Sequence, residues 1–207
     1  MNSQSPKWLA WAREIFSLSQ VGLAYSKNEF DLERYKRFQE ITAEIIASQS
    51  EIARENALES LSMQAGYATP KIDVRGAVIR DGKILLIQEK TDGKWAMPGG
   101  WADLGESPAS VAEREVWEES GFHVRAEKVV AILDANRIEP LEFYHAYKII
   151  FLCKLLDGEP RISIETSAVD FFGLNALPLL STNRTNESML EEVFAHFKNP
   201  ERPTTFD

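Results

Sequence analysis

Three glutamates in one short segment could together hold a metal ion. Glu115, Glu118 and Glu119 are spaced i, i+3 and i+4, so a helix would place their carboxylates on one face. Like charges at this spacing repel, but carboxylate oxygens are the ligands that Mg²⁺ and Mn²⁺ prefer. Arg114 lies one helical turn before Glu118 and can brace its carboxylate. The alternative interpretation is a glutamate-rich helix face exposed to solvent.

The residues around these glutamates predict a helix with both ends marked. Ser107 is a good N-cap, Pro108 suits the first helical position, and Gly121 suits a left-handed residue at the C-terminal end. Small apolar residues recur on the opposite face and predict contact with a core; they are Ala109, Ala112 and Val116. The sequence therefore places the carboxylates on a helix that packs against a core.

The whole stretch from Gly100 to Phe122 fits the pattern G-x5-E-x7-R-E-U-x-E-E-x-G-U, where U is aliphatic or aromatic. This pattern is the Nudix box, so the chain resembles the Nudix hydrolases. The resemblance implies an α/β fold, a Nudix-type α/β/α sandwich with a mixed sheet. It also implies hydrolysis of a nucleoside diphosphate linked to another moiety, with Mg²⁺ or Mn²⁺ and water.

The resemblance also implies roles for residues of the box. The metal ligands would be the Gly100 carbonyl and the carboxylates of Glu115, Glu118 and Glu119. Arg114 would orient a carboxylate, and Glu106 would either join the metal shell through water or pair with Arg114. The catalytic set is therefore Glu106, Arg114, Glu115, Glu118 and Glu119. The general base stays open among the box glutamates and two later acids, Glu142 and Glu187.

Weaker matches outside the box point to one Nudix branch with a helical N-terminal region. They cover residues 70–75, 95–103, 143–148, 165–167 and 177–184. This branch includes ADP-ribose and CDP-choline pyrophosphatases. Many ADP-ribose-specific members have a proline beyond the box, where this chain has Arg137 and its nearest proline is Pro140. Both substrates therefore stay open.

Six residues are candidate substrate contacts: Arg75, Trp101, Asp103, His145, Lys148 and Arg184. Arg75 lies in an apolar strand, where an unpaired charge is costly, so it either reaches a substrate phosphate or pairs with a structural acid. His145 is either a sheet residue or a substrate ligand. Lys148 points either into the cleft or to solvent. Trp101 and Asp103 lie in the loop of the box, where they could contact a base or sugar, and Arg184 could bind phosphate.

Residues 1–66 predict a helical N-terminal domain. Apolar residues follow helical spacing there, including Trp8, Trp11, Ala12 and Ile15 in the first helix. Helices this narrowly striped bury their apolar faces poorly alone, so we expect a homodimer through this region. The alternative is a cap on the catalytic domain of the same chain.

Residues 67–199 predict the Nudix domain, and residues 200–207 a polar tail. Apolar segments at 72–79 and 83–88 flank Asp81-Gly82, a strong hairpin signal. Further strands are expected near 124–133, 144–156 and 168–172, and a final helix near 187–198. Strands interleaved with helices favour a mixed sheet between helical layers.

The composition of the chain narrows the classes of molecule that it is expected to bind. The formal charge of −9 argues against a general binder of nucleic-acid backbone, and a small nucleoside diphosphate derivative is the expected partner. The single cysteine, Cys153, lies in an apolar strand, and we expect a cytoplasmic protein without a membrane span. Removal of 5′ pyrophosphate from RNA and non-catalytic nucleotide sensing remain the alternative functions.

Overall fold

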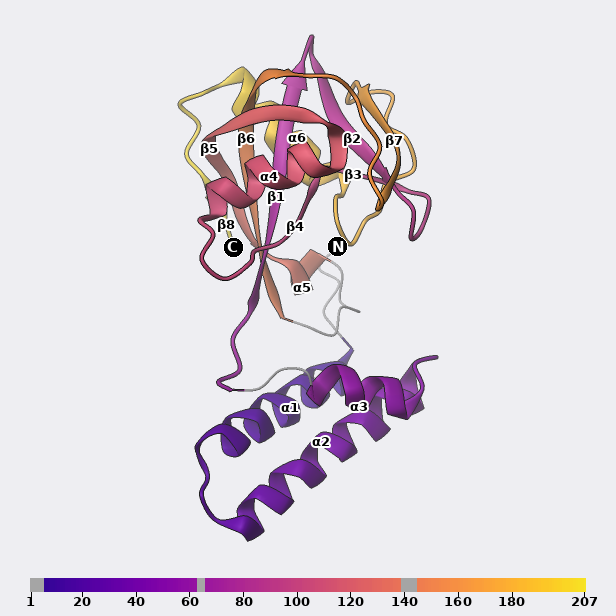
Figure 1. Ribbon diagram of the computed structural model, residues 1–207, viewed down its shortest axis with the longest axis vertical. Helices are drawn as coiled ribbons and strands as arrows, with labels where there is room; N and C mark the ends of the chain where they lie inside the picture. The colour runs from indigo at the N-terminus through magenta and orange to yellow at the C-terminus, as the bar shows by residue number, and fades with distance from the viewer. Residues whose placement is uncertain (1–5, 63–65, 139–144) are drawn as a thin grey trace. The chain divides into compact units, whose positions relative to one another are not determined.

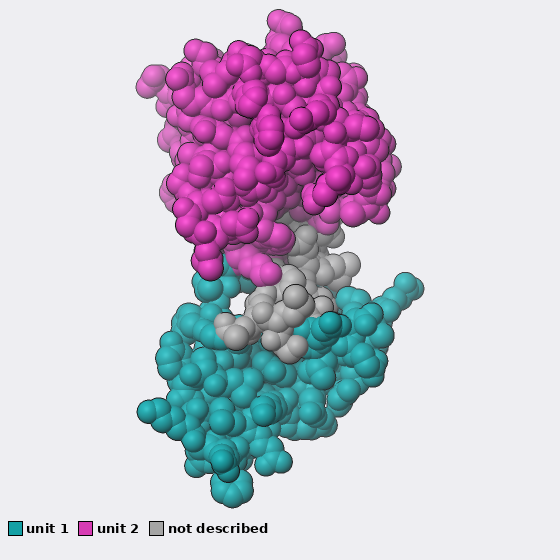
Figure 2. All heavy atoms as spheres, in the orientation of Figure 1, with its two compact units in different colours: residues 1–70, 140–145 teal, residues 71–139, 146–207 magenta. Residues whose placement is uncertain are grey.

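The structure, a computed structural model, describes residues 6–62, 66–138 and 145–207. The chain divides into two compact units, drawn in different colours in Figure 2. One unit comprises residues 1–70 and 140–145, and the other comprises residues 71–139 and 146–207. The predicted domain boundary at residue 66 adjoins residues outside the description and stays a prediction.

The first unit is helical, as the spacing of its apolar residues predicts. Its helices are α1 (Lys7–Tyr25), α2 (Glu29–Gln49) and α3 (Arg54–Ser62). Asn28 caps α2, because its side-chain oxygen accepts a hydrogen bond of 2.9 Å from the Phe30 N–H. The buried cluster of this unit consists of three alanines with Ile46 and Leu61, and larger, partly buried side chains pack against it: Trp8, Phe16, Ile45 and Leu58.

Within the described part of the second unit, eight strands form one mixed sheet. The strand order is β3-β2-β1-β6-β5-β8, with β4 also paired to β1 and β7 to β2. The strands are β1 (Lys71–Arg80), β2 (Lys83–Glu89), β3 (Trp95–Ala96), β4 (Gly99–Trp101), β5 (Phe122–Asp134), β6 (Ala146–Gly158), β7 (Thr166–Phe172) and β8 (Thr205–Phe206). The helices are α4 (Pro108–Ser120), α5 (Ala135–Ile138) and α6 (Glu187–Lys198).

The hairpin predicted at Asp81-Gly82 is confirmed. β1 and β2 pair antiparallel through Ile79↔Ile84, and the two turn residues have φ angles of 52° and 72°. Both values are positive, as a tight hairpin turn requires. β1 also pairs in parallel with β6, so it lies at the centre of the sheet.

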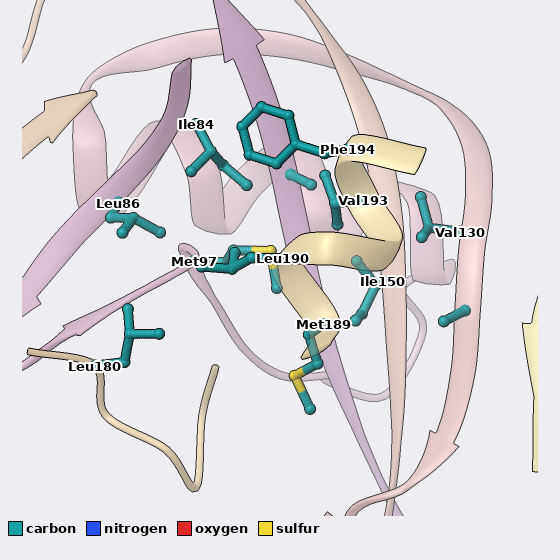
Figure 3. Close-up of a cluster of buried hydrophobic side chains, with 12 residues drawn as sticks. Ile84, Leu86, Met97, Val130, Ile150, Leu180, Met189, Leu190, Val193 and Phe194 are labelled. Carbon is teal, nitrogen blue, oxygen red and sulfur yellow. The ribbon is translucent and has the colours of Figure 1, made fainter. Parts of the chain in front are cut away.

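Helices cover both faces of the sheet (Figure 1). Val111, Ala112 and Val116 of α4 pack on one face, in a cluster with Val74 and Phe151. On the other face α6 packs in a second buried cluster, which also contains Met97 (Figure 3). The predicted α/β/α sandwich with a mixed sheet is confirmed.

The last residues are tied to this unit rather than forming a free polar tail. β8 pairs in parallel with β5 through Ala131↔Thr205 and Ile132↔Phe206. Arg202 donates hydrogen bonds of 2.8 and 3.0 Å to the carboxylate of Glu192 on α6. The difference from the predicted tail arises because long-range partners, which composition does not reveal, hold these residues.

Candidate active site

Helix α4 forms as its end signals predict. Ser107 is the N-cap and exchanges hydrogen bonds with Ser110, Pro108 occupies the first turn, and Gly121 adopts the left-handed conformation with φ 80°. The Gly121 N–H donates to the Trp117 carbonyl at 2.9 Å. These local interactions set both ends of the helix that carries the glutamates.

A glycine on β1 lets α4 lie close to the sheet. A Cβ atom on Gly76 would approach Val116 Cγ2 to 2.4 Å and the Ala112 carbonyl oxygen to 3.4 Å. A larger residue at this position would push the helix away. The close approach of β1 and α4 brings the box glutamates to the segment Met97–Gly100, which we call the glycine turn and whose last two residues open β4.

Two of the three glutamates meet the glycine turn. The Gly99 N–H donates a hydrogen bond of 2.8 Å to Glu119 Oε2. A Cβ atom on Gly100 would lie 2.8 Å from Glu115 Oε1, so the carboxylate of Glu115 rests directly against this glycine. Glu119 is buried, with 5% of its surface exposed, whereas the Glu118 side chain is 46% exposed.

Arg114 links the remaining acids of the box. Its guanidinium donates two hydrogen bonds of 2.8 Å to Glu106, one of 2.9 Å to Glu115 and one of 3.0 Å to Glu118. The bonds from Arg114 lower the pKa of Glu106. Of the two alternatives for Glu106, pairing with Arg114 is the one that matches these contacts.

Burial and mutual repulsion make the carboxylates of Glu115 and Glu119 costly to ionise. Burial raises the pKa of Glu119 to about 8, and the charges of Glu115 and Glu89 act in the same direction, while the Gly99 N–H and Arg75 oppose them. Burial also raises the pKa of Glu115, against the opposing effect of Arg114. A divalent cation between these carboxylates would remove the repulsion.

The donor set fits a hard divalent metal ion, since it offers carboxylate oxygens beside the two glycines. In the described part of the chain, however, no three acidic, histidine or cysteine side chains already lie in an arrangement that could hold a metal. Two of the candidate ligands, Glu115 and Glu118, are hydrogen-bonded to Arg114 instead.

A buried ion group lies under the turn. Arg75 is 5% exposed and donates hydrogen bonds of 3.0 and 3.3 Å to the two carboxylate oxygens of Asp73. Lys148, 1% exposed, also donates to Asp73. Pairing with a structural acid is thus the alternative that matches Arg75, and Lys148 is buried against the same acid rather than pointing to solvent. Asp73 was missed by sequence reasoning, although its i, i+2 spacing from Arg75 places both on one side of β1.

A second acid missed by sequence reasoning is Glu89, at the end of β2. It is 6% exposed and pairs with Arg184 at 3.1 Å, and its charge acts on Arg75 and Glu119. Arg184 also lies 3.5 Å from Asp92. The signal available in the sequence for Glu89 was its position as an acidic residue at the end of an otherwise apolar strand.

The other candidates lie on the surface. Trp101 is 45% exposed, with the Lys71 amino group 5.5 Å from its ring centre, and Asp103 is exposed in the same loop. His145 is exposed immediately before β6. Of the two later acids considered as general base, Glu187 is exposed at the start of α6, and Glu142 lies outside the described residues.

The NUDIX domain model matches residues 70–193, which include the turn, α4 and most of the sheet. The chain is a Nudix hydrolase. A second family model, described as a UDP-X-like N-terminal oligomerisation domain, matches residues 6–61 of the helical unit. Among the described helices, none is long and apolar enough to cross a membrane.

Two of the three relatives below match this Nudix hydrolase over almost its whole length, and the third matches about two thirds of it. YjhB of Bacillus subtilis, named as a candidate ADP-ribose pyrophosphatase, is 40% identical over 97% of both chains. The solved structure of an ADP-ribose pyrophosphatase from Streptococcus suis is 40% identical, with a TM-score of 0.63 over 67% of this chain and 100% of that one. A UDP-X diphosphatase structure is 31% identical, with a TM-score of 0.64 over 97% of this chain and 98% of that one.

Proposed function

We propose that this Nudix hydrolase uses Mg²⁺ or Mn²⁺ to cleave the pyrophosphate bond of a nucleoside diphosphate linked to another moiety, releasing a nucleoside monophosphate. The observation that carries the proposal is the convergence of Glu115 and Glu119 on the turn of Gly99 and Gly100. The metal ligands would be the Gly100 carbonyl and the carboxylates of Glu115, Glu118 and Glu119. The bound metal supplies positive charge that neutralises the pyrophosphate and lowers the pKa of water.

The residues around these ligands orient them. Arg114 joins Glu106 to Glu115 and Glu118, so it holds two of the proposed ligands. The Gly99 N–H holds Glu119 from the turn. Hydrogen bonds of this kind set the direction in which a carboxylate presents its free oxygen.

ADP-ribose is the substrate that we propose first. The support is the names of two relatives that are 40% identical, whereas CDP-choline rests on the sequence resemblance alone. Trp101 and Asp103 would contact the base or sugar because both are exposed beside the metal ligands, and Arg184 and His145 remain candidates. Arg75 and Lys148 are left out of the substrate contacts because both are buried and paired with Asp73.

Product analysis tests the proposal. Purified protein would be incubated with ADP-ribose, CDP-choline, a UDP-linked sugar or a 5′-triphosphorylated RNA, each with Mg²⁺ or Mn²⁺. Release of AMP and ribose 5-phosphate from ADP-ribose is the expected result. Cleavage of CDP-choline or the UDP-sugar alone would overturn ADP-ribose but keep the reaction, and cleavage of RNA alone would favour end processing. No cleavage in any mixture would overturn the proposed hydrolysis.

We also propose that the helical unit joins two copies of the chain. The matching family model is described as an oligomerisation domain. Trp11, Leu18 and Tyr25 are 57%, 63% and 69% exposed on α1. They are seven residues apart and so share one side of the helix, which we call the α1 stripe. Large apolar side chains on the outside of a unit with a small core favour a partner surface of the same kind.

A further inference from the structure

The glycine turn from Met97 to Gly100, whose last two residues pair with β1 as the start of β4, carries two features of the proposed metal site. The Gly99 N–H bonds to Glu119, and Gly100 lies against Glu115. Gly99 has a φ of 149°, and a Cβ atom there would lie 2.0 Å from the Val74 carbonyl oxygen. The turn is therefore held tightly against β1, and a shift of its backbone would move the groups that face both glutamates.

Met97 is the anchored end of this turn. Its N–H donates a hydrogen bond of 2.9 Å to Thr185 Oγ1, and its carbonyl accepts one of 3.2 Å from Arg75 Nη1. Its side chain is fully buried in the α6-side cluster near Leu190 (Figure 3). Both backbone polar groups of Met97 are thus held by side chains from other segments.

The two side chains that hold Met97 are themselves held in place. Thr185 is fully buried, and its N–H donates to the Ser181 carbonyl at 2.7 Å. Arg75 is held by both carboxylate oxygens of Asp73. Because Thr185 and Arg75 are buried, neither presents its polar group to a substrate in solution.

We propose that Thr185 and Arg75 are positioning residues of the active site. From opposite sides they hold the backbone of Met97, which sets the Gly99 N–H and the Gly100 carbonyl relative to the carboxylates of Glu119 and Glu115. This inference rests on the proposed function, because it gives these backbone groups a role in metal binding.

The variant Thr185→Val tests whether Thr185 positions the backbone of Met97 or only stabilises the fold. Valine has nearly the same shape as threonine but leaves the buried Met97 N–H without its acceptor, and the turn relaxes to find another. We expect the Kd for Mn²⁺, measured by electron paramagnetic resonance without nucleotide, to rise about tenfold, as when an outer-shell partner is lost. Thr185→Ser restores the hydroxyl and should restore Mn²⁺ affinity.

A second readout does not depend on metal. Hydrogen exchange of the Gly99 amide, followed by NMR in the metal-free protein, should be faster in Thr185→Val than in wild type and should slow again in Thr185→Ser. Arg75→Lys, which keeps the charge but cannot reach both Asp73 and the Met97 carbonyl, should also speed exchange. The matched control is Thr42→Val, a buried threonine of the helical unit whose hydroxyl donates to the Phe38 carbonyl.

The outcomes separate the two proposals. Unchanged Mn²⁺ affinity together with unchanged Gly99 exchange in Thr185→Val would overturn the positioning role. A wild-type protein that binds no Mn²⁺ would overturn the proposed metal site, and Gly99 exchange would then decide the positioning of the turn alone. Equal losses in Thr185→Val and Thr42→Val would also overturn the inference, because they would show a general loss of stability.

Discussion

At the scale of single residues, Glu119 is a buried carboxylate that is costly to ionise. It is buried beside Glu115 and Glu89, accepts a hydrogen bond from Gly99, and has a pKa raised to about 8 by burial. A buried charge of this kind destabilises the protein unless a partner offsets it. We infer that the partner is the divalent metal ion.

The substitution Glu119→Gln tests whether the charge of Glu119 is needed for metal-dependent hydrolysis. The amide keeps the size of the side chain but removes the negative charge, so the rate of pyrophosphate hydrolysis should fall by more than about a hundredfold, or about 2.7 kcal/mol. Initial rates with saturating Mg²⁺ would measure the loss, and circular dichroism would check folding. Glu127→Gln is the control, because Glu127 is an exposed glutamate paired with Arg125. A near-normal rate in folded Glu119→Gln would contradict the assignment.

At the scale of elements, Glu192 connects α6 to the final strand. It accepts hydrogen bonds from both Arg202 and Thr205, and it lies 3.1 Å from His196 Nε2. The bonds from Arg202, followed by the hydroxyl of Thr205, lower the pKa of Glu192 to about 2 although its burial opposes this. The pairing also keeps β8 on the edge of β5, where open strand edges favour aggregation.

A lowered carboxylate pKa gives a pH dependence of definite sign. The unfolded chain binds the proton at the ordinary value of 4.5 and the folded chain only near 2, so the stabilisation is complete above pH 4.5 and is lost as the pH falls toward 2. Glu192→Gln should therefore lower the free energy of unfolding by about 1 kcal/mol at neutral pH, with a smaller difference near pH 3. Urea unfolding between pH 7 and 3 would measure this.

The control for Glu192→Gln is the variant Glu191→Gln. Glu191 is an exposed glutamate one position earlier on α6. This variant should follow the wild-type curve. Parallel curves for Glu192→Gln and wild type over the whole pH range would contradict the role of the lowered pKa.

In helix α1, packing buries some residues and exposes others that helical spacing alone places on the same face. The sequence groups Trp11 and Ala12 on a single apolar side, but Ala12 is buried in the helical core while Trp11 is exposed. Small residues allow α1 and α2 to approach closely, and a Cβ atom on Gly22 would overlap the ring of Tyr35. The large side chains are left on the outside, where they form the α1 stripe.

At the scale of the whole molecule, the α1 stripe predicts the oligomeric state. Leu18→Glu would place a charge at the centre of a symmetric interface twice, so we expect the Kd for self-association to rise by more than about a hundredfold. Sedimentation velocity at micromolar concentration would measure the change. Ala24→Glu, at an exposed position of α1 outside the stripe, is the matched control. A wild-type monomer, or a Leu18→Glu dimer as tight as wild type, would contradict the proposed interface.

The sequence by itself determined the parts of this Nudix hydrolase that depend on near neighbours. The ends of α4, its face of three glutamates and the hairpin at Asp81-Gly82 follow from caps, spacing and backbone preference over a few residues. The box pattern also identified the family, because its fixed spacing brings acids and glycines together wherever it occurs.

Tertiary structure alone decided which distant groups pair beneath the site. The partners Asp73 and Lys148 are 75 residues apart, and Met97 and Thr185 are 88 apart. Charged and polar side chains have many potential partners in a sequence, and burial in one sheet selects among them, because an unpaired polar group in the core is costly. The cost of an unpaired charge explains why Arg75 lies beside Asp73 in the buried ion group. Packing of the helical unit also decides that Trp11 and Leu18 lie outside its core.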